Sequence, residues 1–232
     1  MFHIKICGVR HPSDIEAVSA AGADAIGLNF FANSIRFADP LDARTAGLSQ
    51  TAEQENLLRV GVFVNATIPS IRQIAKTVGL DAVQLHGDEP VSFGIDLLHA
   101  VQKPVIRAIK LPTVGLDAGL LEAAINPWIE IGCHPLLDAD AGSAHGGSGK
   151  NLDWQAIGIW ATQHPAASFT LAGGLNPKNV GLAIKLSRAT SVDTASGVEQ
   201  PRGQKHAELI RGFVQACGKS GLSATDDQDV GN

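Results

Sequence analysis

The sequence predicts an α/β fold in which eight parallel strands close into a single-domain (β/α)8 barrel of the TIM type. Short apolar runs alternate with helical patterns along nearly the whole chain, and there are eight such runs. Most are continuous rather than alternating, as expected for parallel strands that are covered on both faces. Repeated strand–helix units are joined by right-handed crossovers, and eight units in a chain of 232 residues match a TIM barrel.

The predicted strands occupy residues 3–7, 24–30, 57–65, 80–86, 104–110, 135–140, 168–173 and 190–196. Helical patterns with start or stop signals lie between them, at residues 13–22, 69–79, 176–186 and 205–218. Asn176 suits a helix N-cap, and Pro177 suits the first turn. An open, doubly wound sheet is the alternative, but no Gly-x-Gly-x-x-Gly pattern follows the first strand.

Composition limits the function classes. The net charge is −5 and no basic block is present, which argues against a nucleic-acid partner. No apolar stretch of about 18 residues predicts a membrane span, and no signal peptide is recognised at the N-terminus, so we expect a cytoplasmic protein. Three cysteines without Cys-x-x-Cys spacing argue against a zinc site or a disulfide framework. We expect the barrel to occupy residues 1–217 and the polar residues 218–232 to form a disordered tail.

Candidate site residues follow from the fold, because active sites of TIM barrels lie at the C-terminal ends of the strands. Cys7 ends the first strand, and its thiol is either a small buried core group or a proton-transfer group at the barrel mouth. Asp138 ends an apolar run, where a carboxylate needs a partner or a function. Further polar candidates on these strands or the loops after them are Arg36, His86 and Arg107.

Glycine-rich loops follow three of the late strands. Gly173 and Gly174 follow the seventh strand, and Ser196 and Gly197 follow the eighth. Loops at these two places bind phosphate in many TIM barrels, through backbone N–H groups and a helix N-terminus. The loop after the sixth strand is long and glycine-rich, which indicates a lid or a close approach to a ligand, and it contains Lys150.

Taken together, these motifs resemble those of the phosphoribosylanthranilate isomerases of tryptophan biosynthesis over residues 3–217. The similarity lies in KICGVR, GADAIGLNF, GVFVN, LDAVQLHGDE, LLDAD followed by GGSGKNLDW, LAGGLNPKNV and VDTASGVE. It implies a TIM barrel that catalyses an Amadori rearrangement without a metal or an organic cofactor. The substrate would be N-(5-phosphoribosyl)anthranilate, and the product 1-(2-carboxyphenylamino)-1-deoxyribulose 5-phosphate. It also suggests a monomer or a homodimer.

The resemblance assigns roles to particular residues. Cys7 matches the family's general base and Asp138 its general acid, while Arg36 matches the arginine that contacts the anthranilate carboxylate. The phosphate would bind around the glycine loops, with His86 and Arg107 as further substrate contacts. Two alternatives remain: a sugar isomerase of the histidine pathway, which typically has Asp at the position of Cys7, and a catalytically inactive barrel that serves as a binding module.

Overall fold

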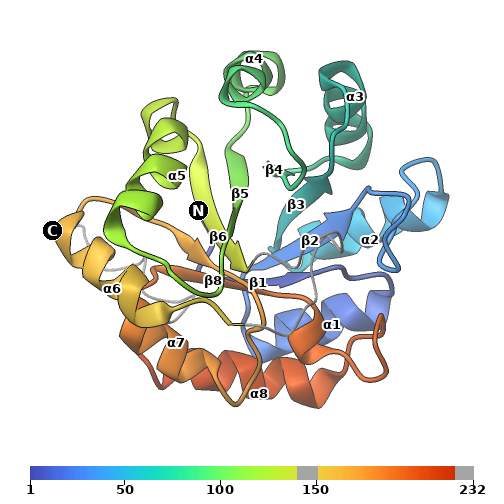
Figure 1. The fold of residues 1–232 in the computed structure, drawn as a ribbon. Coiled ribbons are helices and arrows are strands. Elements are labelled where there is room, and N and C mark those ends of the chain that lie inside the picture. The colour runs from blue at the N-terminus through green and yellow to red at the C-terminus, as the bar shows by residue number, and fades with distance from the viewer. Residues whose placement is uncertain (140–150, 223–232) are drawn as a thin grey trace, which may run out of the picture.

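The computed structural model describes residues 1–139 and 151–222. Eight parallel strands close into a barrel in the order β1 to β8, each paired with its neighbours in sequence and β8 with β1. Figure 1 shows the helices forming an outer ring around the strands. The predicted single-domain TIM barrel is therefore confirmed.

The strands are generally shorter than the apolar runs that predicted them, because the ends of those runs turn away from the ladder. Their bounds are β1 Ile4–Cys7, β2 Ala25–Asn29, β3 Leu58–Phe63, β4 Ala82–Leu85, β5 Val105–Leu111, β6 His134–Ala139, β7 Thr170–Leu171 and β8 Ser191–Thr194. The helices are α1 Pro12–Ala21, α2 Ala43–Gln54, α3 Ile68–Val78, α4 Val91–Val101, α5 Ala118–Glu130, α6 Trp154–Gln163, α7 Val180–Ser187 and α8 Ala207–Gly218, with a short 3-10 helix at Ser196–Val198.

Helix starts differ by a few residues from those predicted. The N-cap of α3 is Thr67, whose hydroxyl accepts a bond from the Ser70 amide. Helix α7 begins at Val180, after Asn176 and Pro177 have formed a turn. At the chain end, α8 reaches Gly218 and Leu222 is still buried against the core. The rest of the predicted tail, residues 223–232, lies outside the described residues, so the predicted domain boundary stays a prediction.

Alternating side chains divide the buried residues into two layers. One set lies between the strands and the helices, and a smaller set fills the barrel interior: Phe2, Ala25, Val60, Ala82, Ile106, Ala108, Leu136 and Ala172. Side chains one pleat further along each strand from this inner set reach the C-terminal mouth of the barrel. The register of the closed barrel therefore decides which polar residues meet there.

Candidate active site

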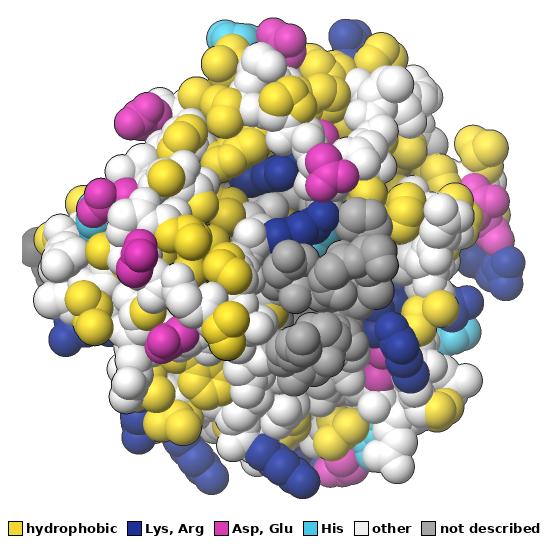
Figure 2. Space-filling model, in the orientation of Figure 1, with side chains coloured by type: hydrophobic (Ala, Val, Ile, Leu, Met, Phe, Trp, Pro, Cys, Tyr) yellow, Lys and Arg dark blue, Asp and Glu magenta, His cyan; other side chains and the backbone are white. Residues whose placement is uncertain are grey.

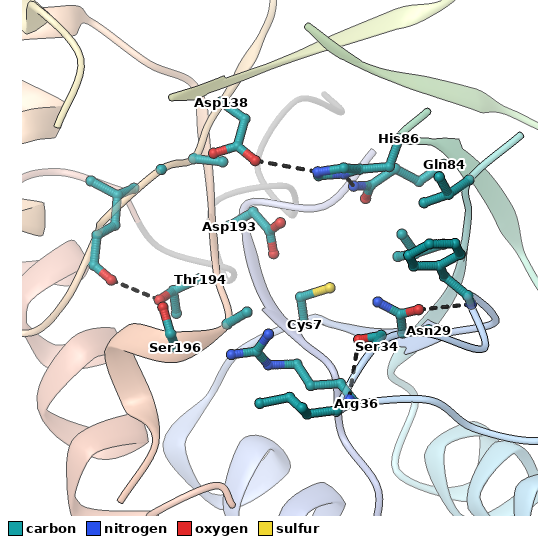
Figure 3. Close-up of a pocket in the computed structure, with 18 of the residues that line it drawn as sticks. Cys7, Asn29, Ser34, Arg36, Gln84, His86, Asp138, Asp193, Thr194 and Ser196 are labelled. Atoms are coloured by element: carbon teal, nitrogen blue, oxygen red, sulfur yellow. Dashed lines mark hydrogen bonds and ion pairs between the residues drawn. The ribbon is translucent and has the colours of Figure 1, made fainter. Parts of the chain in front are cut away.

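A cavity of about 520 Å³ opens at the C-terminal ends of the strands. It is bounded by strand ends and by the loops after β2, β7 and β8, and Figure 3 shows the labelled side chains pointing into it from these elements. Figure 2 shows Lys and Arg side chains near the centre of the face seen in Figure 1. The polar side chains that line the cavity are Cys7, Asn29, Asn33, Ser34, Arg36, Gln84, His86, Asp138, Asp193, Thr194, Ser196 and Arg202.

Cys7 is the last residue of β1, and its thiol lines the cavity although the residue is only 8% exposed. Gly27 pairs with it on β2, and a Cβ at Gly27 would lie 2.6 Å from Cys7 Sγ. A glycine is therefore needed beside the thiol. Burial raises the pKa of Cys7, against the opposing effect of nearby cations. The neutral thiol is therefore favoured, and a thiolate depends on positive charge close to it.

Asp138 lies across the cavity from Cys7, near the end of β6 (Figure 3). His86 Nε2 is 3.4 Å from Asp138 Oδ2, and His86 Nδ1 is 3.0 Å from Gln84 Nε2. If the Gln84 amide nitrogen donates to Nδ1, the imidazole carries its proton on Nε2, the ring nitrogen nearer to Asp138. His86 thus lies beside one oxygen of the Asp138 carboxyl group.

Arg36, in the loop after β2, is held by a carboxylate that follows β8, and both of these strands pair with β1. Its Nε and Nη2 donate to the two oxygens of Glu199 at 2.6 and 2.7 Å, a bidentate pair. Glu199 also accepts from Lys205 Nζ at 2.8 Å and from the Gly203 amide. Two cations share one carboxylate, so this cluster carries a net positive charge beside the cavity and suits an anionic group of a ligand.

The stem of Arg36 crosses the chain just after Cys7. Gly8 has a φ of +78°, and a Cβ there would lie 2.3 Å from Arg36 Cδ. Glycine is required at this position for two reasons: it adopts the left-handed backbone conformation without strain, and it has no side chain to collide with Arg36. The turn that leads the chain out of β1 therefore also seats the arginine.

The cluster formed by Arg36, Lys205 and Glu199 leads to a prediction about stability. Burial opposes ionisation of Glu199, but the bonds from Arg36, Lys205 and Gly203 outweigh it and lower the pKa of Glu199 to about 2. The pKa of Glu199 is about 4.5 in the unfolded chain. The contribution of ionised Glu199 to the free energy of unfolding is therefore complete above about pH 4.5 and is lost as the pH falls toward 2. We expect Glu199→Gln to lower the free energy of unfolding at pH 7 by roughly 3 kcal/mol.

Urea unfolding of the parent and of Glu199→Gln, measured between pH 7 and pH 3, checks this. The difference between the two proteins should shrink as the pH falls below 4.5. Glu208→Gln is the matched control, because Glu208 pairs with Arg211 on the exposed surface of α8. A constant difference across the pH range would contradict the assignment.

The loops after β7 and β8 pack closely against each other and against β6. A Cβ at Gly173 would lie 2.6 Å from the Ala139 backbone nitrogen, and one at Gly197 would lie 1.8 Å from the Leu175 carbonyl oxygen. Thr194 Oγ1 donates to that same carbonyl at 2.7 Å. Gly173 and Gly174 both have positive φ and line the cavity, so an anion can approach their backbone there. Ser196, from the loop after β8, lines the same cavity.

The family of this barrel follows from comparison with known proteins. A family model described as N-(5'phosphoribosyl)anthranilate (PRA) isomerase matches residues 4–216. The chain belongs to the phosphoribosylanthranilate isomerase family. It is accordingly an isomerase of tryptophan biosynthesis.

Individual members of the phosphoribosylanthranilate isomerase family agree with this. The chain is 38% identical to the N-(5'-phosphoribosyl)anthranilate isomerase of Myxococcus xanthus, over 92% of this chain and 95% of that protein. The crystal structure of the isomerase from Thermotoga maritima has a TM-score of 0.81 and 32% identity, and the match covers 94% of this chain and all of that one. A further isomerase structure, with a TM-score of 0.77, 30% identity and the same coverage, contains reduced 1-(o-carboxyphenylamino)-1-deoxyribulose 5-phosphate.

The structure brings most of the predicted site residues of this isomerase to one cavity. Those that line it are Cys7, Arg36, His86, Asp138, Gly173, Gly174 and Ser196, whereas Arg107 and Gly197 are not among the lining residues. Arg107 has its guanidinium over the Trp128 ring and bonds Glu89 at 2.6 Å, in the layer between strands and helices. Glu89 also accepts from the Asn65 and Gly87 amides, so Arg107 ties the loop that follows His86.

Sequence reasoning missed several residues of the isomerase site. Glu199 and Lys205 lie beyond the eighth strand, and nothing local to them predicts a bond to Arg36. Gln84 could have been found, because it lies on β4 two residues before His86, and alternation along a strand turns both side chains to the same side. Lys150, in the glycine-rich loop, lies outside the described residues. Among residues 1–139 and 151–222 there is no group of three or more His, Cys, Asp or Glu placed to hold a metal ion.

None of the helices in the described parts of the chain is both long and apolar enough to cross a membrane.

Proposed function

We propose that this isomerase catalyses the Amadori rearrangement of N-(5-phosphoribosyl)anthranilate with Asp138 as general acid and Cys7 as general base. The observation that carries the proposal is that the two groups face each other across one cavity, from β6 and β1. An acid and a base on opposite walls can act on opposite sides of one sugar ring.

Ring opening requires a proton on the furanose oxygen as its bond to C1′ breaks. A protonated Asp138 donates it, with the His86 imidazole beside the carboxyl group. The anthranilate nitrogen then forms a protonated Schiff base with C1′, which acidifies the C2′ hydrogen. The Cys7 thiolate removes that hydrogen as a proton, and the resulting enolamine tautomerises to the 2′-ketone. The substrate's own nitrogen accepts the electron pair, so the chemistry calls for no cofactor.

The carboxylate and the phosphate at the two ends of the substrate fit the Arg36 cluster and the glycine loops of the cavity. The anthranilate carboxylate would bind Arg36, whose cluster with Lys205 and Glu199 retains a net positive charge. The phosphate would bind the backbone at Gly173 and Gly174, with Ser196 from the neighbouring loop. A carboxylate at one end and a phosphate at the other would hold the ribose between Cys7 and Asp138.

The direct test follows the fluorescence of N-(5-phosphoribosyl)anthranilate as the purified protein converts it, with the product identified by mass spectrometry. We expect turnover to the ribulose phosphate. The aminoimidazole substrate of the analogous histidine-pathway isomerisation is the control, and it should be converted far more slowly. Binding of the anthranilate substrate without turnover would overturn the catalytic proposal. Sedimentation of the same sample distinguishes a monomer from a homodimer.

Arg36→Met is expected to raise KM and leave kcat little changed. The arginine would bind a carboxylate that does not react, so the contact is similar in the ground state and the transition state. The loss corresponds to about 2 kcal/mol, a 30-fold rise in KM, if the pair is desolvated. Steady-state kinetics checks this, with Arg44→Met as control because Arg44 is exposed on α2. A fall in kcat at constant KM would contradict the role of Arg36.

A further inference from the structure

Lys5 is a buried cation inside the barrel. It precedes Cys7 by two residues on β1, so both side chains project into the barrel interior, with Lys5 one pleat below the thiol. The side chain of Lys5 is fully buried. An ammonium group without a partner in such a place costs several kcal/mol, so its charge must be balanced nearby.

The balancing group is Asp193. The two residues pair in register between β1 and β8, and Lys5 Nζ lies 2.8 Å from Asp193 Oδ1. Asp193 itself lines the cavity, and Figure 3 shows its carboxylate projecting there beside the Cys7 thiol. Asp193 therefore links the buried ammonium of Lys5 to the cavity, beside the proposed base.

Charged groups approach Cys7 from every element around it. Lys5 comes from its own strand and Asp193 from β8, while Arg36 follows β2 and Lys205 follows the short 3-10 helix. The other titratable side chains that line the cavity are Arg202, from the loop region after β8, and His86 and Asp138, which lie on the opposite wall and pair with each other.

Two of these cations are committed elsewhere. Arg36 and Lys205 both donate to Glu199, and the proposed function assigns Arg36 to the substrate carboxylate. Lys5 is different, because it is buried in the barrel interior and its ammonium group lies against the carboxylate of Asp193, beside the Cys7 thiol. It is in place before a substrate arrives.

We infer that Lys5 supplies the positive charge that compensates the Cys7 thiolate, and that Asp193 holds the Lys5 ammonium in position. The inference rests on the proposed role of Cys7 as the base. Lys5 acts through Cys7 and contacts no reacting atom, so it is a positioning residue.

The direction of the pKa shifts agrees with this geometry. Burial raises the pKa of Cys7, Lys5 is the main group that lowers it, and Asp193 raises it. Burial alone would lower the pKa of Lys5, but its interactions with Asp193 and Cys7 raise it overall, so Lys5 keeps its charge. The two members of the pair therefore have opposite effects on the thiol.

That opposition is the basis of the test. We measure the pH dependence of iodoacetamide alkylation at Cys7, by mass spectrometry of the peptide that contains it, in Lys5→Met, Asp193→Asn and the parent. Lys5→Met should move the inflection upward by roughly one pH unit or more, and Asp193→Asn should move it downward. Both variants break the same ion pair, so a purely structural role would move the two inflections in one direction or not at all. Either of those results would overturn the inference.

The double variant Lys5→Met/Asp193→Asn keeps the test decisive if Lys5→Met alone does not fold. It contains no unpaired charge, and it differs from Asp193→Asn only at Lys5. Its inflection should lie above that of Asp193→Asn, and equal inflections would overturn the inference.

Turnover by Cys7→Ser separates the two proposals. If that variant is inactive while Lys5→Met titrates like the parent, the role of Lys5 fails and the role of Cys7 stands. If Cys7→Ser turns over normally, Cys7 is not the base, and the influence of Lys5 on the thiol is still measurable by alkylation.

Discussion

Cys7→Ser is expected to fold normally and to lose activity by roughly 10²–10⁴-fold, the range typical for a general acid or base. A serine hydroxyl is a far weaker base than a thiolate near neutral pH, although it has nearly the same shape and still fits beside Gly27. The loss should appear in kcat, because the proposed role of Cys7 lies in the removal of the C2′ proton and not in substrate binding. Steady-state turnover of N-(5-phosphoribosyl)anthranilate measures it.

Cys217→Ser is the matched control. Cys217 is a buried thiol on α8 away from the cavity, and burial raises its pKa to about 12, so it stays protonated. Its substitution can cost stability, which the melting temperature reports, but should leave kcat at the parent level. Turnover by Cys7→Ser within a few-fold of the parent would show that another group removes the proton.

Asp138→Asn is expected to stop ring opening while the cavity still binds a ligand. Asparagine keeps the size of aspartate and can still interact with His86, but it has no proton to give to the furanose oxygen. Turnover should fall by roughly 10²-fold or more. The reduced product analogue found in a similar isomerase structure is a suitable probe, since it needs no ring opening. Its dissociation constant should change little, because the contacts proposed for its carboxylate and phosphate remain.

For Asp138→Asn, both the affinity for the analogue and the rate of the chemical steps must be measured. Calorimetry with the analogue gives the affinity, and a single-turnover experiment gives the rate of the chemical steps. Asp96→Asn makes the same change on the exposed surface of α4 and should alter neither value. If Asp138→Asn binds the analogue and turns over like the parent, the carboxyl group is structural and the acid is another residue.

The sequence by itself predicted the barrel and the positions of its strands. Eight continuous apolar runs with helical patterns between them have few other solutions, because each strand must be covered on both faces. It also placed Cys7, Asp138 and the glycine loops at strand ends, since the hydrophobic pattern ends where the strand does. Local patterns determine these features, and so a linear sequence contains them.

Only the tertiary structure decided which charges meet. Arg36 and Glu199 are 163 residues apart in the chain, and nothing near either of them predicts a bidentate pair. Arg107 was expected at the mouth, but alternation along β5 turns it outward onto Trp128. Lys5 lies within the first predicted strand without any sign of a partner, and closure of β8 onto β1 buries it beside Asp193. A pairing between distant strands depends on barrel closure and register, which are properties of the whole sheet and leave no mark on the neighbouring residues.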